Sequence, residues 1–229
     1  MTLRALILDV DGTLAETEEA HRRAFNDSFA SAGLDWHWTI SDYRHLLKTT
    51  GGKERMAAHR ATLGHGPTDA EIAALHRRKT ARYGEILAEG GIALRPGVSN
   101  LITTARDRGL ALAIATTTNR ANVDALAMAC WDQPAAEIFD VIAAGDDVAA
   151  KKPAPDVFLL ALQRLALPPE QALAFEDSRN GLKSAQSAGL RVVITPSLYT
   201  QDEDFTGADL IVPDLADPGF ATRFEQWLT

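Results

Sequence analysis

Two carboxylates stand one residue apart at the end of an apolar run near the start of the chain. Residues 3–8 lead directly into Asp9 and Asp11, and Gly12 follows them. If the strand continues through both aspartates, side-chain alternation places them on one side, where like charges repel unless a cation or a shared proton holds them. Because this arrangement costs stability, it indicates a functional site.

Three further polar clusters follow later apolar runs. In an open α/β sheet, ligands bind beyond the carboxyl ends of the strands, so we expect all these clusters to meet in one crevice. The later clusters are Thr116-Thr117-Thr118-Asn119, Lys151-Lys152-Pro153 and Glu176-Asp177-Ser178.

The combination suits phosphoryl transfer. Mg²⁺ accepts carboxylates together with water and a substrate phosphate. The Thr116 hydroxyl and the Lys152 charge would neutralise the phosphoryl oxygens in the transition state. Asp9 would attack phosphorus and form an aspartyl-phosphate, while Asp11 would give a proton to the departing oxygen and later take one from water.

Each cluster also has a purely structural interpretation. Asp-x-Asp-Gly is often a strand-ending turn, and its resemblance to a calcium loop fails because the glycine and the final glutamate are misplaced. Thr116 could cap a helix, Lys152 could be a solvated lysine, and the Glu176 pair could be helix-start acids. Their order at successive strand ends favours the functional interpretation.

The elements that must position these residues alternate between strands and helices, which predicts a doubly wound α/β domain with a parallel sheet. A long interval without a convincing strand follows the first strand and has helical periodicity. We therefore expect a catalytic core at 1–15 and 88–229 and an inserted helical domain at 16–87. The strands are expected at 3–8, 111–116, 141–144, 173–175, 192–194 and 210–212, and the helices of the core at 96–108, 119–129, 155–165 and 178–188.

The four clusters resemble, in order and type, the motifs of the haloacid dehalogenase-like hydrolase superfamily. The resemblance implies a Rossmann-like core with a helical cap, Mg²⁺ as cofactor, Asp9 as nucleophile and Asp11 as acid and base. Its metal ligands would be Asp9, Asp11 through its backbone carbonyl, Glu176 and Asp177. Haloacid dehalogenases themselves lack the second aspartate, so Asp11 favours phosphoryl chemistry.

Within the superfamily, the run Lys152–Asp156 and the Glu-Asp-Ser-x-x-Gly sequence look like the β-phosphoglucomutase group. The segment Gly51-Gly52-Lys53-Glu54-Arg55-Met56 resembles the cap of CbbY-type phosphatases, which act on xylulose-1,5-bisphosphate, an inhibitory by-product of Rubisco. The resemblance implies a phosphatase acting on a small sugar bisphosphate, with xylulose-1,5-bisphosphate as the expected substrate. A mutase and a non-catalytic phosphate-sensing module are the alternatives, and Thr13, where the mutases carry an apolar residue, favours hydrolysis by resemblance.

The glycine pair is physically suited to a second phosphate. Gly51 and Gly52 leave backbone N–H groups open at a helix start, and Lys53 and Arg55 add positive charge, although a solvated basic loop is the alternative. By resemblance, Glu16, Thr17 and His21 would contact the sugar or phosphate, with helix packing as the alternative for His21. We also expect Lys48, Thr117 and Asn119 to bind substrate, and Arg77-Arg78-Lys79 is a second basic candidate.

Composition and charge limit the classes of protein to which this chain can belong. With 229 residues and 46% hydrophobic residues, the chain can bury a sizeable core. The net charge of −8 argues against nucleic acid as the main partner. No apolar run is long enough for a membrane span and no signal peptide is evident, so we expect a cytoplasmic protein, acting as a monomer. The single cysteine, Cys130, excludes an internal disulfide.

Overall fold

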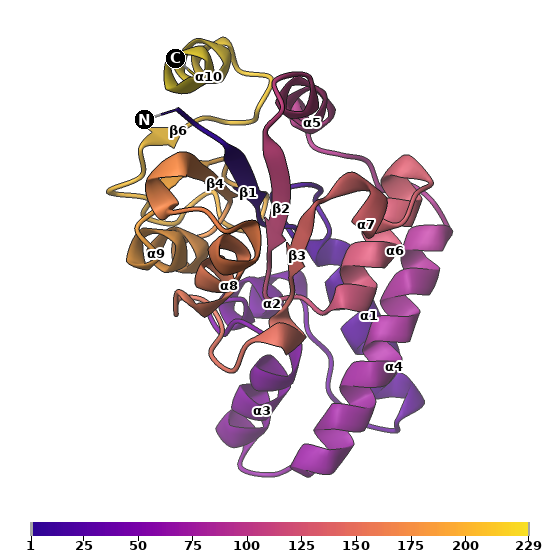
Figure 1. Cartoon of the computed structure of the whole chain (residues 1–229). Helices are drawn as coiled ribbons and strands as arrows, with labels where there is room; N and C mark the ends of the chain where they lie inside the picture. The colour runs from indigo at the N-terminus through magenta and orange to yellow at the C-terminus, as the bar shows by residue number, and fades with distance from the viewer. Residues whose placement is uncertain (1, 229) are drawn as a thin grey trace.

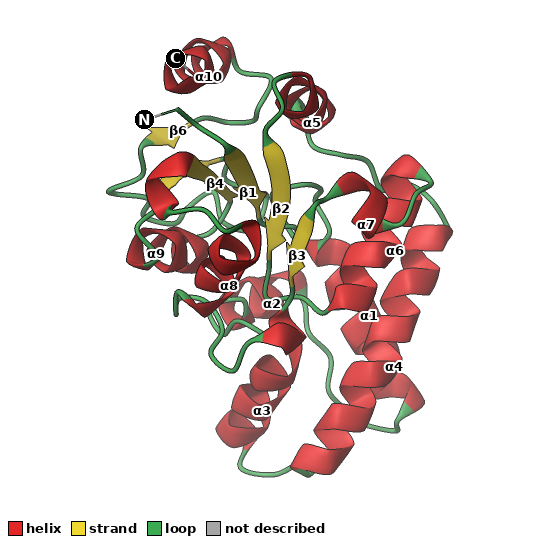
Figure 2. Ribbon diagram, in the orientation of Figure 1, coloured by secondary structure: helices red, strands yellow, loops and turns green. Residues whose placement is uncertain are grey.

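The computed structural model describes residues 2–228, and its centre is a six-stranded parallel sheet in the order β3-β2-β1-β4-β5-β6 (Figures 1 and 2). The central strands are almost continuously apolar because both sheet faces are covered. Leu8 pairs with Ile114 on one side and Phe175 on the other, which aligns the ends of three strands. The strands are β1 (Ala5–Leu8), β2 (Ala111–Ala115), β3 (Val141–Ala143), β4 (Ala172–Glu176), β5 (Arg191–Ile194) and β6 (Leu210–Ile211).

Helices pack on both faces of the sheet and form two cores. One core joins the Leu6 and Leu8 side of β1 to α5, α6, α7 and α10, and the other joins the Ile7 side to α8 and α9. Because successive side chains of β1 point to opposite faces of the sheet, the strand contributes residues to both cores. The helices are α5 (Val98–Asp107), α6 (Arg120–Trp131), α7 (Ala135–Ile138), α8 (Asp156–Leu165), α9 (Arg179–Ser187) and α10 (Pro218–Leu228), with short 3₁₀ turns at Gly145–Asp147 and Pro169–Gln171.

The predicted α/β fold class is confirmed, with strand ends differing by one or two residues. Helix α7 has only four residues, too few for a visible period. Helix α10 was also not predicted, although Phe220, Phe224 and Trp227 recur at its buried face.

The interval after β1 is helical throughout, and we call helices α1–α4 the helical insert. It has its own aromatic core, in which Phe25, Phe29, Trp36, Trp38 and Tyr43 pack together. Its proposed status as a separate domain at 16–87 remains a prediction. The helices are α1 (Glu18–Ser31), α2 (Ile40–Leu46), α3 (Gly52–Leu63) and α4 (Asp69–Ala88), and capping boxes begin α2 and α4.

The two connections between the insert and the sheet lie side by side and meet at Arg95. Ala15 and Leu94 form an antiparallel bridge, and the Arg95 amide donates to the Leu14 carbonyl at 2.8 Å. The Arg95 guanidinium is 9% exposed. It donates to the carbonyls of Gly12, Thr195, Pro196 and Pro213 and pairs with Glu16 at 3.5 Å.

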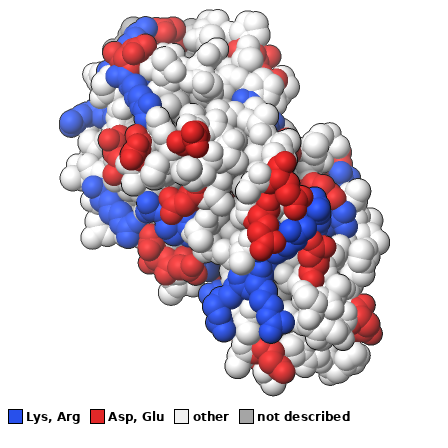
Figure 3. All heavy atoms as spheres, turned by 90° about the vertical axis from the view of Figure 1, so that its right-hand side faces the viewer, with Lys and Arg blue, Asp and Glu red and all other residues white. Residues whose placement is uncertain are grey.

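The surface beside the insert carries charges of both signs. On the face in Figure 3, Lys and Arg side chains lie directly next to Asp and Glu side chains. Arg82 of α4, for example, pairs with Asp27 at 2.7 Å and with Glu85 at 2.9 Å. Among residues 2–228, no helix combines the length and apolar character that a membrane span requires.

Candidate active site

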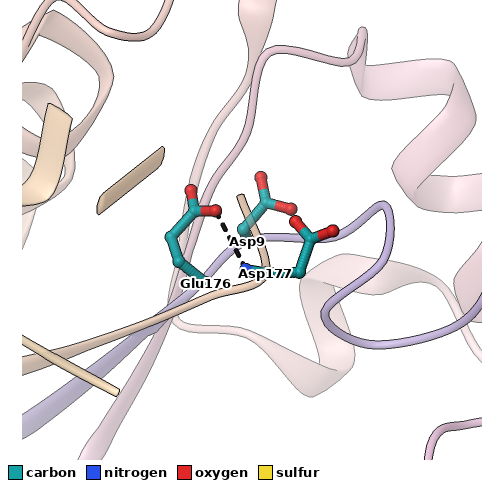
Figure 4. Close-up of side chains that lie close together, drawn as sticks. All are labelled: Asp9, Glu176 and Asp177. Atoms are coloured by element: carbon teal, nitrogen blue, oxygen red, sulfur yellow. Dashed lines mark hydrogen bonds between the residues drawn. The ribbon is translucent and has the colours of Figure 1, made fainter. Parts of the chain in front are cut away.

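Three buried carboxylates gather where β1 and β4 end (Figure 4). Asp9 follows β1, Glu176 ends β4 and Asp177 comes next, and one oxygen from each lies within 4.8 Å of the others. The amide of Asp9 donates to the Phe175 carbonyl at 3.0 Å, so the sheet ladder itself fixes the position of Asp9. Parallel pairing thus brings together acids that are 167 residues apart in the sequence.

Lys152 lies between two of these acids. Its Nζ donates to Asp9 Oδ1 at 2.6 Å, to the carbonyl of Ala115 at 2.8 Å and to Glu176. Although burial opposes its charge, Asp9 and Glu176 raise the pKa of Lys152 above its ordinary value. The lysine is therefore a fixed positive charge that holds one oxygen of Asp9.

The carboxylates still repel one another in spite of this lysine. Burial raises the pKa of Asp9 to about 8, with Glu176 adding to the rise and Lys152 opposing it. Burial and the charges of Glu176 and Asp9 likewise raise the pKa of Asp177 well above its usual range. Clustered oxygen donors that resist ionisation without a cation fit a hard divalent ion such as Mg²⁺.

Adding Mg²⁺ is expected to stabilise the protein more at about pH 8 than at about pH 5. A folded-state pKa raised above the unfolded value gives stability at low pH that is lost as pH rises through about 8. Mg²⁺ needs the ionised carboxylates, so its contribution grows over the same interval. At about 100 times its Kd, Mg²⁺ should raise the melting temperature by about 5 °C or more at the higher pH.

Thermal unfolding with and without Mg²⁺ checks this expectation. Asp177→Asn is expected to remove most of the increment, whereas Asp107→Asn, at the far end of α5, should retain it. An increment of the same size at both pH values would contradict a carboxylate site.

Asp11 does not continue the strand, contrary to the alternation expected for it. Strand β1 ends at Leu8, and Gly12 has φ +83°, a conformation that glycine adopts easily. A Cβ at Gly12 would also collide with the Asp177 carboxylate. This turn gives Asp9 and Asp11 separate sets of partners.

The Asp11 carboxylate faces the helical insert. It accepts from Thr17 Oγ1 at 2.6 Å and lies 2.9 Å from His21 Nε2, while Lys79 Nζ lies 2.6 Å from His21 Nδ1. A lysine ammonium only donates, so Nδ1 accepts from Lys79 and Nε2–H donates to Asp11. Burial alone would raise the pKa of Asp11, but His21, Thr17 and Lys79 together hold it below its ordinary value.

Lys79 itself is buried at 4% exposure. Burial lowers its pKa to about 7, although Asp11 opposes the change. The His21 ring also stacks on Tyr83, with 4.0 Å between the ring centroids, which fixes its plane. Lys79 of α4, His21 of α1 and Asp11 therefore form a chain of hydrogen-bonded side chains.

The cluster after β2 lies at the start of α6. Thr116 is 1% exposed, and its Oγ1 accepts from the Thr118 amide at 3.2 Å. The Asn119 side chain caps α6 through the Asn122 amide and also donates to Thr80 of α4 at 2.9 Å. This segment thus both faces the site and contacts the insert.

The insert contributes the start of α3. No side chain caps its first residues, and Gly51 has φ +87°. Lys53 lies 3.6 Å from Asp146 of the sheet domain. Arg55 is 8% exposed and donates to the Tyr43 hydroxyl at 2.9 Å, so the aromatic core of the insert fixes its direction.

These groups line one pocket between the sheet and the insert, which we call the strand-end pocket. Glu16, Thr17, Lys48 and Glu176 lie outside its lining: Glu16 pairs with Arg95, Thr17 with Asp11, and Glu176 with Lys152 beneath the surface, while the Lys48 carbonyl accepts from Asn180. Of the predicted residues, the pocket brings together Asp9, Asp11, His21, Gly51, Gly52, Lys53, Arg55, Thr116, Thr117, Asn119, Lys152 and Asp177. Their functional roles remain predictions.

Two pocket residues on α4 were not singled out from the sequence. His76 lines the pocket, and Lys79 was treated only as part of a basic run with Arg77 and Arg78, which are exposed. A helix turns about 100° per residue, so neighbours in a run face different ways. The sequence does contain a signal for these two residues, because His76 and Lys79 are polar and lie on the same stripe of the helix as the buried Ile72, Leu75 and Tyr83.

Comparisons with known proteins agree with this geometry. The sequence model of the haloacid dehalogenase-like hydrolases matches residues 3–189. Protein CbbY of Rhodobacter capsulatus is 66% identical over 216 residues, covering 94% of this chain and 95% of that protein.

Solved structures give the same result. The crystal structure of CbbY from Rhodobacter sphaeroides in complex with phosphate is 54% identical, with a TM-score of 0.91, and covers 95% of this chain and 97% of that chain. A mutant of that protein, with the same identity, coverage and TM-score, was crystallised with xylulose-1,5-bisphosphate. A β-phosphoglucomutase from Clostridium difficile, 19% identical with a TM-score of 0.81, covers 99% of this chain and 97% of that chain and shares the fold.

Proposed function

This chain belongs to the haloacid dehalogenase-like hydrolase family, and from this premise we propose that it is a Mg²⁺-dependent phosphatase of a small sugar bisphosphate, xylulose-1,5-bisphosphate, acting through an aspartyl-phosphate. The observation that carries the proposal is the buried Asp9 carboxylate, held by Lys152 beside Glu176 and Asp177. The substrate rests on likeness to the CbbY mutant crystallised with this bisphosphate.

In this proposal, Asp9 is the nucleophile. Lys152 binds its Oδ1 at 2.6 Å, which orients the carboxylate and leaves Oδ2 for attack on phosphorus. The carboxylates of Asp9, Glu176 and Asp177 and the Asp11 backbone carbonyl would hold Mg²⁺, which supplies positive charge next to the phosphoryl oxygens when bound. Thr116 would donate its hydroxyl to the transferring group.

Asp11 is the proposed acid and base. In the first step, a new bond joins Asp9 Oδ2 to phosphorus, the bond from phosphorus to the sugar oxygen breaks, and Asp11 gives that oxygen its proton. In the second step, Asp11 takes a proton from the attacking water, a bond forms between the water oxygen and phosphorus, and the bond from Asp9 Oδ2 to phosphorus breaks, which releases phosphate and restores the Asp9 carboxylate. His21 and Thr17 both donate to Asp11, which favours its carboxylate and therefore supports the second step.

The second phosphate is assigned to the start of α3. Uncapped N–H groups at a helix N-terminus attract anions, and Lys53 and Arg55, which both line the pocket, add positive charge. Because the insert supplies these groups while the sheet supplies Asp9, a bisphosphate would touch both parts of the molecule. Remote binding energy of this kind raises turnover when it orders the reacting centre.

The proposal predicts Mg²⁺-dependent release of free phosphate from xylulose-1,5-bisphosphate. Release should be measured over a panel of sugar mono- and bisphosphates with and without Mg²⁺, together with product analysis that detects isomerised sugar phosphate. We expect one free phosphate per bisphosphate and the highest kcat/KM for this substrate. Isomerised sugar phosphate without free phosphate would indicate a mutase instead, and binding without turnover would indicate a phosphate-sensing module.

A variant in the same panel tests the second-phosphate assignment. Lys53→Ala is expected to lower kcat/KM for the bisphosphate on the order of tenfold and to affect monophosphates much less. Arg23→Ala, which removes an exposed ion pair with Glu89 on the insert, is the matched control. Equal losses on both substrate types would move the second-phosphate site elsewhere in the pocket.

A further inference from the structure

Two polar side chains cover the glycine pair at the start of α3. A Cβ at Gly51 would collide with the Glu54 carboxylate, and a Cβ at Gly52 would lie 2.7 Å from His76 Nε2. His76 thus lies directly over the Gly52 backbone, on the side of the pocket to which we assign the second phosphate. Only a residue without a side chain leaves room for the imidazole there.

His76 is polar, half-buried and unpaired. Within residues 2–228, neither ring nitrogen has a hydrogen-bond partner, in contrast to His21, whose two nitrogens are both engaged. Each nitrogen is therefore free to form a hydrogen bond with a ligand. A ligand that offers an acceptor oxygen beside Gly52 would supply one such partner.

The charges around His76 come from each helix packed there. Helix α3 contributes Lys53, Glu54 and Arg55, helix α4 contributes Lys79, and helix α1 contributes Glu18 and His21. Lys79, Lys53 and Arg55 make an additional proton on His76 unfavourable in the absence of an anion.

This inference rests on the proposed bisphosphate substrate. We propose that His76 is a specificity-determining residue, which takes up a proton from solvent and donates a hydrogen bond to the second phosphate beside Gly52. A substrate with an uncharged group at this place leaves His76 neutral and unpaired. His76 therefore distinguishes a bisphosphate from a monophosphate.

The titration of His76 is consistent with this role. Burial lowers its pKa to about 3, and Lys79, Lys53, His21 and Arg55 add to the effect. A phosphate dianion placed among these cations reverses the local potential and favours the imidazolium. Binding of the second phosphate therefore raises the pKa of His76. Binding takes up protons and weakens as the pH rises above the raised pKa.

Calorimetry of the Asp9→Asn protein tests the proposal, because this variant should bind substrate without consuming it. Xylulose-1,5-bisphosphate is titrated in two buffers of different ionisation enthalpy near neutral pH, which gives the number of protons taken up. The same titration of the double variant Asp9→Asn/His76→Gln gives the proton uptake without His76. Because Lys79 is present in both proteins, the difference in proton uptake reports His76. Asp9→Asn/His65→Gln is the matched control, since His65 is exposed on the insert outside the pocket.

We expect the His76→Gln protein to take up fewer protons, by up to about one per bisphosphate bound. In otherwise wild-type protein, His76→Gln should lower kcat/KM for the bisphosphate on the order of 10- to 100-fold, with a much smaller loss for xylulose 5-phosphate. Equal proton uptake in the two proteins, with wild-type phosphate release intact, overturns the role of His76 and leaves the proposed function standing. Failure of the wild-type protein to bind or hydrolyse the bisphosphate overturns both.

Discussion

Replacing Asp9 by asparagine is expected to lower phosphate release by several orders of magnitude while leaving the fold intact. The amide fills the same volume and still accepts from Lys152 through its oxygen, but it cannot form the aspartyl-phosphate. Since burial raises the pKa of Asp9 to about 8, the substitution also removes a carboxyl that resists ionisation. Stability should therefore change by no more than about 1 kcal/mol.

Single-turnover assays and denaturant unfolding of the same preparations separate these two effects. Asp107→Asn, an exposed aspartate near the end of α5, supplies the control for an Asp-to-Asn change without a role in the site. Phosphate release by Asp9→Asn within tenfold of wild type would be incompatible with a nucleophilic Asp9.

Lys152→Met is expected to impair both activity and stability. Lys152 is 4% exposed and is the shared partner of Asp9 and Glu176, so methionine would leave two buried carboxylates without their cation. Loss of one member of a buried ion network typically costs about 3–5 kcal/mol. Turnover should fall by several orders of magnitude, because Asp9 loses its orienting contact and the transition state loses a fixed charge.

The stability deficit of Lys152→Met should depend on pH in a defined direction. Without Lys152, which lowers the pKa of Asp9 in the native protein, that pKa rises further. Wild-type Asp9 ionises as the pH passes through about 8, whereas Asp9 in the variant resists ionisation to higher pH, so the deficit should be smaller at about pH 6 than at about pH 9. Urea unfolding at both pH values measures this, with the exposed Lys183→Met on α9 as control. A deficit independent of pH would show that Lys152 acts through packing alone.

The sheet and the residues at its edge could be predicted because both depend on local sequence. Each strand is a short apolar run, and the clusters follow these runs, directly after β1, β2 and β4 and beyond the Gly145–Asp147 turn after β3, so the parallel topology brings Asp9, Lys152 and Asp177 to the same edge of the sheet. The direction of Asp11 could not be predicted in this way, because the strand ends at Leu8 and Asp11 lies in the following turn, where Thr17 and His21 of the insert are its partners.

The part of the site that the insert contributes could be predicted less well from the sequence. Which residues of α4 reach the pocket depends on how the helix is rotated against α1, and that rotation is set by contacts between residues far apart in sequence. Lys79 is buried beside His21 while Arg77 and Arg78 are exposed, although the three are adjacent. For Glu16, the substrate contact that the resemblance implies stays a prediction, and its carboxylate pairs with Arg95 and accepts from the Leu198 amide at 3.3 Å.

The position of Arg95 has a mechanical consequence. A segment that is joined to the rest of the protein by two independent connections can bend at each of them. When both connections are bound to the same residue, they can move only together. Arg95 fastens the outgoing connection through Glu16, and it belongs to the returning connection itself. Its remaining bonds reach Gly12, next to Asp11, the Thr195–Pro196 segment and the carbonyl of Pro213. Rotation of the insert about this anchor would have few degrees of freedom, and its axis would pass close to Asp11, the proposed acid and base.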